Sequence, residues 1–350
     1  MSHWVEETLE KGLRVGYQLE RTIHSGKSKF QTVDLVDLEP FGRTLLIDGL
    51  IQSTQVDEFV YHEALVHPAL LAHPNPRSVY IGGGGEGSTA REVLRHRSIE
   101  RCVMVDIDAD VVHFCREHLP ENAAAFADSR LELIIDDAKG VLERQKSGFD
   151  VIIMDLDDPL EGGPCYQLYT AEFYRMIREK LNPGGIFVTQ SGQAGIKQHG
   201  LVWSPVHNTL RTVFPHVSAY NQAVYSFMDE WGWNMAHTDP STAALLPPDE
   251  IDARIAKRIN GELRFLDGQS YVGLFCLSKV HRRTLAKEDR VLSLEDASFG
   301  FMQSQGLCVA EEPSLSRHSS RAAEAPRLSR RPSKLEADDG SDYRYSHSDI

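Results

Sequence analysis

Four short apolar runs, alternating with helix-like segments between residues 78 and 156, limit most strongly what this chain can fold into. The runs are SVYIG, RCVMVD, LELII and DVIIMD, and the segments between them space their apolar residues as amphipathic helices do. The alternation continues to AEFYRMIREKL, IFVTQ and HGLVWSPVHNTLRTV, with further strands expected at VSAYNQ and YVGLFCLS. Strands joined through helices pair in parallel by right-handed crossovers. We therefore predict an α/β domain with a Rossmann-like sheet.

The region before this alternation has the pattern of antiparallel hairpins. Apolar and polar residues alternate from Tyr17 to Ser53, and turn sequences occur at Glu39–Gly42 and at Asp48–Gly49. A helical pattern then runs from Asp57 to Ala72 and ends before Pro74. We predict a small antiparallel β module over residues 1–56 and assign residues 57–290 to the α/β domain.

The composition changes after about Ala310 to serine, arginine, proline and acids. This segment has too little apolar content to offset the entropy lost on ordering, so we predict that residues 311–350 are disordered. It contributes a net charge of −1 to the total of −14, which leaves a strongly acidic folded body. An acidic surface disfavours nucleic acid and anionic membranes as partners and favours small cationic ligands, although it also serves solubility alone.

The location of the protein is predicted from its cysteines and its apolar segments. The five cysteines have no CxxC spacing, which fits neither a disulfide framework nor a zinc site and favours a reducing compartment. No apolar run in the sequence is long enough to span a bilayer. We expect a cytoplasmic protein that has no membrane partner.

A glycine-rich loop with one acid follows the first predicted strand of the α/β domain. In Gly82–Gly87 the sequence is GGGGEG, which lets the backbone approach a nucleotide closely. Glu86 stands where a dinucleotide's pyrophosphate would lie, and a carboxylate there repels phosphate. The ligand should therefore carry no phosphate and should offer a cation to Glu86. The alternative is a tight turn with a solvated glutamate.

Acids also end the next two predicted strands. Asp106 and Asp108 lie about twenty residues beyond the loop, and Asp106 is the better placed to accept two ribose hydroxyls. Asp137 follows the third strand and is placed to accept from an adenine amino group. An adenosine site without phosphate is typical of sulfonium nucleosides, so we predict an S-adenosyl compound. The alternative is that these acids only terminate strands.

The fourth strand ends on a cluster of carboxylates. Asp155, Asp157, Asp158 and Glu161 lie at the same predicted edge and precede a Gly/Pro loop. The ammonium groups of a polyamine have pKa values near that of lysine, about 10.4, so a polyamine is a cation at neutral pH. The cluster therefore favours a polyamine as second substrate, held by some of these carboxylates while another removes a proton from the reacting nitrogen.

Together these motifs resemble the polyamine aminopropyltransferases, the family of spermidine, spermine and thermospermine synthases. The resemblance covers residues 3–290 and rests on LLIDGLIQSTQVDEFVYHEALVHPAL, GGGEGS, DID, DDA and DLDDP. The chain is most similar to plant-type thermospermine synthases through GGGEGSTARE, DLDDPLEGGPCYQLYT and EWGWNMA. The resemblance implies a fold like that of S-adenosylmethionine-dependent methyltransferases for the catalytic domain. It also implies a homodimer or homotetramer formed through the N-terminal hairpins.

The resemblance further implies roles for individual residues. Asp155 corresponds to the general base and Asp158 to a polyamine-binding acid. Tyr61, His62 and Gln190 correspond to positions that contact substrate, and His62 stands where spermidine synthases often have glutamine. Glu86 is expected to contact the aminopropyl ammonium of the donor, and Asp106 its ribose. Asp137 and Ala138 are expected to contact its adenine. Gln31 and Gly83 are expected to make further contacts with the donor.

The reaction that the resemblance implies moves an aminopropyl group from decarboxylated S-adenosylmethionine, a co-substrate, to spermidine, giving thermospermine and 5'-methylthioadenosine. No prosthetic group is expected, and no metal, because the histidines lack metal-ligand spacing. The residues 159–167 are expected to close over both substrates. Spermidine synthase or spermine synthase activity remains an alternative, and a non-catalytic polyamine-binding protein is a more remote one. A methyltransferase would have to accept the donor's carboxylate, which Glu86 opposes.

Overall fold

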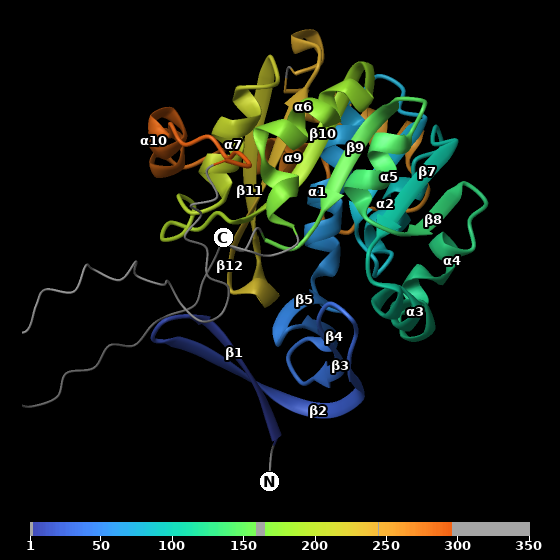
Figure 1. Ribbon diagram of the computed structural model, residues 1–350, viewed down its shortest axis with the longest axis vertical. Helices are drawn as coiled ribbons and strands as arrows, with labels where there is room; N and C mark the ends of the chain where they lie inside the picture. Colours follow the sequence, from blue (N-terminus) through green and yellow to red (C-terminus); the bar gives the residue numbers. More distant parts are fainter. Residues whose placement is uncertain (1–2, 159–164, 244, 296–350) are drawn as a thin grey trace, which may run out of the picture. The chain divides into compact units, whose positions relative to one another are not determined.

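The computed structural model describes residues 3–158, 165–243 and 245–295. Residues 159–164 of the expected lid 159–167, which include Glu161, and the predicted disordered segment 311–350 lie outside the described residues. The described part contains two separate β-sheets, one of five strands and one of seven (Figure 1). None of its helices is long and apolar enough to cross a membrane.

The N-terminal sheet is antiparallel throughout, in the order β1-β2-β3-β4-β5. Its strands are β1 (His3–Glu10), β2 (Leu13–Lys27), β3 (Thr32–Leu38), β4 (Gly42–Ile47) and β5 (Leu50–Thr54). The predicted hairpins between Tyr17 and Ser53 are confirmed, and the turns fall where predicted. The first strand was not predicted, since β1 and the start of β2 carry little apolar alternation: Glu7 is the one buried residue of β1, and Trp4 is 59% exposed.

The large sheet has the order β11-β12-β10-β9-β6-β7-β8. The strands β6 (Ser78–Gly83), β7 (Arg101–Asp106), β8 (Leu131–Ile135), β9 (Phe149–Asp155) and β10 (Leu181–Gln193) are parallel, as the alternation predicts. The strand order reverses between β6 and β9, and ligands bind at such a switch point, outside the carboxyl ends of the strands. The Gly loop and the acid cluster follow these two strands.

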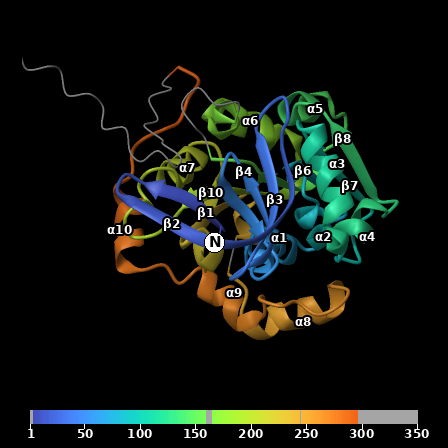
Figure 2. The ribbon, with the colours of Figure 1, turned by 90° about the horizontal axis from the view of Figure 1, so that it is seen from below.

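Helices cover both faces of the large sheet, which is why its strands are apolar on both sides. One face packs on α1 (Glu58–Ala72), α2 (Ser88–Leu94), α8 (Pro248–Arg258) and α9 (Gly268–Leu274). The other packs on α5 (Ala138–Arg144), α6 (Ala171–Lys180) and α7 (Trp203–Arg211). The two layers are visible in Figure 2. The helix α3 (Ala109–His118) instead packs on β3 and β4 of the N-terminal sheet. The short helix α4 (Ala123–Phe126) contacts α2. The last helix, α10 (Lys279–Lys287), contacts α7.

One prediction for the C-terminal half is corrected, and one motif gains a structure. The expected strand at YVGLFCLS is wrong, because Tyr271 and Leu274 lie on one buried side of helix α9. This helix begins with a capping box, in which Asp267 and Ser270 each accept from the other's backbone N–H. The segment EWGWNMA, which was noted only as a motif, forms β12 (Asp229–His237) and pairs antiparallel with both β10 and β11 (His216–Val224).

Candidate active site

A cavity of about 370 Å³ lies at the carboxyl ends of the parallel strands. It is lined by the N-terminal sheet, the start of α1, and the loops after β6, β7, β8 and β9. Every residue predicted to bind the donor or the acceptor lines this one cavity: Gln31, Tyr61, His62, Gly83, Glu86, Asp106, Asp137, Ala138, Asp155, Asp158 and Gln190. The structure therefore brings together residues that are as much as 159 positions apart in the sequence.

The Gly loop is shaped by close approach of two strands. Gly83 pairs with Asp155 in the register of β6 and β9, and has a φ of 84°. A Cβ atom at Gly83 would lie 2.1 Å from the carbonyl oxygen of Asp155, and one at Gly85 would lie 2.6 Å from the carboxylate of Asp106. Only glycine is compatible with both positions. The loop thus brings the backbone beside two of the predicted functional acids.

Asp106 faces the cavity, while its neighbour Asp108 has a structural role. The carboxylate of Asp106 accepts from the backbone N–H groups of Gly85 and Asp108, at 2.9 and 2.8 Å. Burial raises its pKa above the ordinary value. Asp108 instead caps α3 and accepts from the side chains of Ser28 and Gln31, at 2.5 and 3.1 Å. This pair of bonds ties the N-terminal sheet to the α/β domain and positions Gln31 at the cavity.

Asp137 is anchored by the helix that it begins. Its side chain accepts from the backbone N–H groups of Lys139 and Gly140 at the start of α5, at 3.2 and 2.8 Å. Carboxylates are stabilised at helix N-termini by these otherwise unpaired donors. Asp137 and Ala138 therefore present a rigid polar edge to the cavity.

Asp155 is oriented by one hydroxyl donor on each of its oxygens. Tyr61 donates to Oδ1 at 2.7 Å, and the hydroxyl of Thr89 donates to Oδ2. Burial, together with the charge and hydrogen bond of Asp155, raises the pKa of Tyr61 well above its ordinary value, so this phenol stays protonated and remains a donor. The free lone pairs of Asp155 are available to a proton or a cation in the cavity.

Gln190 connects Asp158 to the aromatic side chain of Trp231. Its side-chain nitrogen donates to Asp158 at 3.2 Å and to the carbonyl oxygen of Leu156, while its oxygen accepts from the indole N–H of Trp231 at 3.2 Å. Burial raises the pKa of Asp158 to about 6. The amide of Gln190 therefore links the carboxyl group of Asp158 to the indole of Trp231.

Three cavity residues were missed from the sequence. Trp231 lines the cavity, whereas Trp233, two residues along the same strand, is fully buried in the core. Phe227 lies 4.8 Å from Trp231 and 5.8 Å from Tyr61 between ring centroids, and these rings form a wall suited to cations and methylene chains.

Asp157 is the third missed residue, although it was noted as part of the acid cluster. Burial, followed by the charges of Asp158, Asp106 and Asp155, raises its pKa to about 7. Its backbone carbonyl accepts from Tyr169 at 3.1 Å. Within the described part of the chain no donor contacts its carboxylate, in contrast to Asp106, Asp155 and Asp158.

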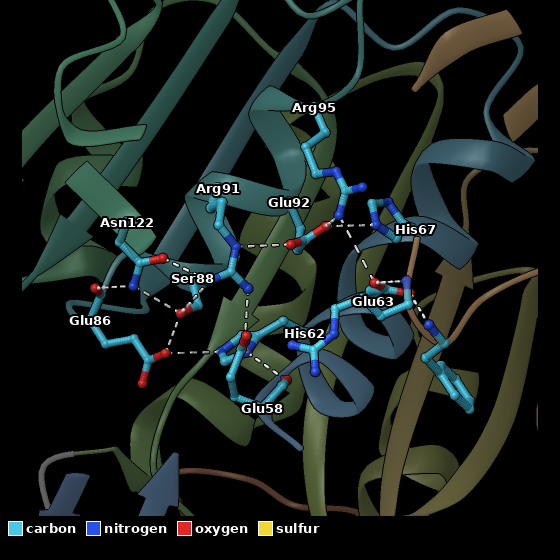
Figure 3. A network of polar contacts seen from close by, with 12 residues as sticks. Glu58, His62, Glu63, His67, Glu86, Ser88, Arg91, Glu92, Arg95 and Asn122 are labelled. Carbon is cyan, nitrogen blue, oxygen red and sulfur yellow. Dashed lines mark hydrogen bonds and ion pairs between the residues drawn. The ribbon is translucent and has the colours of Figure 1, made fainter. Parts of the chain in front are cut away.

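Glu86 lies in a buried polar network (Figure 3). Its Oε1 accepts from the hydroxyls of Ser53, at 3.1 Å, and Ser88, and lies 3.7 Å from Nε2 of His62. Nδ1 of His62 is 2.8 Å from the Glu58 carboxylate. Glu58, His62 and Glu86 are close enough to surround an ion. However, Arg91 donates to the same Glu58 oxygen at 2.7 Å, so a cation from the protein already pairs with one of these three groups. The absence of a metal stays a prediction.

Comparison with known families covers most of the chain. Residues 58–244 match the model of the spermine/spermidine synthase domain, and residues 3–55 match that of the spermidine synthase tetramerisation domain.

Individual relatives match over similar lengths. Thermospermine synthase ACAULIS5 of Arabidopsis thaliana is 50% identical over 298 residues, which cover 85% of this chain and 87% of that protein. A polyamine aminopropyltransferase of Aeropyrum pernix is 43% identical over 299 residues, covering 85% of this chain and 95% of that protein.

Two solved structures have a similar fold. The crystal structure of spermidine synthase from Thermotoga maritima has a TM-score of 0.74 at 28% identity, covering 82% of this chain and 95% of that one. A spermidine synthase in complex with the transition-state analogue AdoDATO has a TM-score of 0.75 at 28% identity, covering 82% and 96%.

Proposed function

Because the chain belongs to the spermine/spermidine synthase family and is therefore an aminopropyltransferase, we propose that its acceptor is spermidine and its product thermospermine. The donor in this proposal is decarboxylated S-adenosylmethionine, and the second product is 5'-methylthioadenosine. The 50% identity to a thermospermine synthase supports the choice of product. The observation that carries the reaction is one cavity that brings together the carboxylates of Glu86, Asp106, Asp137, Asp155 and Asp158.

The donor is proposed to lie along the switch point between β6 and β9. Asp106, already rigid through two backbone bonds, accepts the ribose hydroxyls, and Asp137 with Ala138 contacts the adenine. Gly83 permits close passage of the nucleoside, and Gln31 lies against it from the N-terminal sheet. Glu86 pairs with the ammonium at the end of the aminopropyl chain. With the donor bound in this way, the methylene carbon next to its sulfonium lies near Asp155.

Asp155 is proposed to act as the general base of a single displacement. It removes a proton from the acceptor ammonium, and the freed nitrogen lone pair attacks the methylene next to sulfur. The new C–N bond forms as the C–S bond breaks, and the C–S electron pair stays on the sulfur of neutral 5'-methylthioadenosine. Tyr61 and Thr89 fix the direction of the carboxylate, so that alignment of the reacting atoms provides much of the acceleration.

The acceptor is proposed to lie along Asp158, Gln190 and the aromatic wall. Asp158 binds an ammonium that does not react, while Tyr61, His62 and Trp231 line the path of the carbon chain. The full length of the polyamine is then held so that one particular nitrogen reaches Asp155. Which end of spermidine reacts decides between thermospermine and spermine.

The test is to incubate the purified protein with decarboxylated S-adenosylmethionine and with putrescine, spermidine or spermine separately. Products are resolved by a chromatography that separates thermospermine from spermine. Thermospermine formed from spermidine, and lost in Asp155→Asn, is the expected result. Spermidine formed from putrescine, or spermine from spermidine, would replace the proposed product. Absence of any product from every amine would favour the non-catalytic polyamine-binding protein.

The assembly is also a proposal. The match of residues 3–55 to a tetramerisation domain supports a homo-oligomer formed through the N-terminal sheet, as a dimer or tetramer. Light scattering of the purified chain measures its mass directly. A cytoplasmic location and the absence of nucleic-acid and membrane partners remain expectations from composition.

A further inference from the structure

The reaction above leaves unexplained why Glu86 is surrounded by further buried charges. Glu58, His62, Glu86 and Arg91 form what we call the Glu86 cluster (Figure 3). Arg91 donates to Glu58 at 2.7 Å, Glu58 accepts from Nδ1 of His62 at 2.8 Å, and Nε2 of His62 faces Glu86 at 3.7 Å. The side chains are between 5% and 19% exposed, so solvent screens their charges poorly.

With Glu58 and Glu86 both ionised, the Glu86 cluster is electrically neutral only if His62 carries a proton. Glu58 and Glu86 contribute two negative charges and Arg91 one positive charge, so the imidazolium supplies the second. An uncompensated buried charge is strongly unfavourable. Burial alone would lower the pKa of His62, but the hydrogen bond to Glu58 and the charges of Glu86, Glu58 and Asp155 outweigh it and raise the pKa to about 9.

The other charged groups around the cluster have partners of their own. Glu92 also accepts from Arg91, and is matched by Arg95 at 2.8 Å and His67 at 3.1 Å. Asp155 faces His62 from β9, and the sulfonium of the donor brings a charge to match it. The charge balance of the Glu86 cluster is therefore set by Glu58, His62, Glu86 and Arg91 themselves. The phenol of Tyr61, which also contacts His62, stays neutral.

Arrival of the donor disturbs this balance. If the aminopropyl ammonium binds Glu86, as proposed above, the cluster gains one positive charge and the ammonium lies close to the imidazolium. Loss of one proton from His62 restores neutrality and removes the repulsion. The neutral imidazole can keep its Nδ1–H bond to Glu58 and offers the Nε2 lone pair toward the ammonium.

We propose that Glu58 and Arg91 are positioning residues that keep His62 protonated in the free enzyme, and that binding of the donor ammonium at Glu86 releases that proton to solvent. The inference rests on the proposed function, since it requires the donor. It follows that donor affinity rises with pH below 9, with a dissociation constant that falls about tenfold per unit while one proton is released.

Calorimetry of donor binding at pH 8, in two buffers with different ionisation enthalpies, measures the number of protons released. Asp157 and Asp158 are already ionised at this pH, so they contribute little. We expect about one proton per donor bound, as in one-proton linkage. The matched probe is 5'-deoxy-5'-dimethylsulfonioadenosine, which keeps the sulfonium but lacks the aminopropyl ammonium, and we expect it to release almost none.

Variants separate this linkage from a merely structural role. His62→Gln removes the titrating group, and we expect donor binding without proton release and with a dissociation constant that is flat between pH 7.5 and 8.5. Arg91→Gln leaves the cluster with an extra negative charge, so the ammonium balances it and His62 keeps its proton in the complex. Arg91→Lys retains the charge and should restore the release. The NMR signal of His62 reports its protonation in each complex.

The outcomes distinguish the two proposals. Donor binding and turnover by the wild-type protein without proton release at pH 8, or equal release by His62→Gln, would overturn the proton exchange and leave the aminopropyl transfer intact. Failure of the wild-type protein to bind the donor at all would overturn the proposed function and this inference with it.

Discussion

At the scale of single residues, the site is a set of carboxylates that differ in how they are satisfied. Asp106 and Asp137 accept from backbone N–H groups, whereas Asp155 accepts from two hydroxyls. Backbone donors are fixed by the fold and suit an acid that only binds. Hydroxyl donors orient a carboxylate without supplying a full charge, which leaves Asp155 able to take a proton.

Removal of one of these hydroxyls should reduce turnover more than binding. We expect Tyr61→Phe to lower kcat by about ten- to a hundredfold, because a hydrogen bond to a charged group contributes about 1.5–3 kcal/mol. Thr89→Val removes the donor on the other oxygen and serves as the matched variant. Steady-state kinetics check this result, and the dissociation constant of the donor should change little. A Tyr61→Phe enzyme with full kcat would show that Asp155 needs no orientation.

The raised pKa values of Asp157 and Asp158 predict a pH dependence of acceptor binding. Below about 6 both acids are protonated and neutral, and they ionise as the pH rises through about 6 and about 7. Carboxylates bind ammonium groups, so KM for spermidine should fall as the pH rises from 5.5 to 8 at saturating donor. In Asp157→Asn the upper step should disappear, and in Asp157→Glu it should persist. Identical profiles for wild type and Asp157→Asn would contradict a contact between Asp157 and the acceptor.

At the scale of elements, helix α1 connects the cavity to the C-terminal part of the fold. Tyr61 and His62 face the cavity, while Glu63 on the same turn is fully buried away from it. The two oxygens of Glu63 accept from the backbone N–H groups of residues 264, 265 and 266, at 2.8 to 2.9 Å. One carboxylate thereby holds the segment between α8 and α9 against α1.

Loss of this carboxylate should destabilise the fold. We expect Glu63→Ala to lower the free energy of unfolding by about 3 kcal/mol, since it leaves three backbone N–H groups without their buried acceptor. Glu262→Ala, at an exposed position of the same segment, is the control and should change stability by less than about 0.5 kcal/mol. Urea unfolding measures both. Equal stabilities would show that the segment is held by its apolar contacts alone.

At the scale of the whole molecule, the net charge of −14 is opposite in sign to the positive charge of both substrates. Such a field attracts cationic ligands and is screened by salt over about 8–10 Å at 0.10–0.15 M. We expect kcat/KM for spermidine to fall several-fold between 0.05 and 0.5 M NaCl. Inhibition by 5'-methylthioadenosine, which is uncharged, is the comparison and should hardly change. Equal salt dependence of the two would show that the field does not contribute to acceptor capture.

The assignment of residues 311–350 to a separate disordered segment is tested by truncation. A chain that ends at residue 310 should keep its kcat/KM and its thermal midpoint, because the sheets, the cavity and the helices that cover them all lie before residue 296. Activity assays and calorimetry on the truncated and full-length proteins check this. A clear loss of either property would show that the segment contributes to the folded body.

The sequence by itself determined the parts of the site that depend on short-range spacing. Apolar runs that alternate with helices predict parallel strands, and the carboxyl ends of parallel strands lie at one edge of the sheet. Acids at the ends of those runs, such as Asp106 and Asp155, must therefore lie at that edge. The Gly loop and Glu86 could be located in the same way. These features are readable because strand and helix periodicity arises from neighbours two to four residues apart.

Only the tertiary structure decided how these parts meet. The strand order places β6 beside β9, so that Gly83 lies against Asp155, and it brings Trp231 from β12 into the cavity rather than the core. The neutral cluster of Glu58, His62, Glu86 and Arg91 likewise exists only when α1, α2 and the Gly loop have packed. Such contacts join residues far apart in the chain, and their energies depend on burial and on the other charges present, which local spacing does not encode.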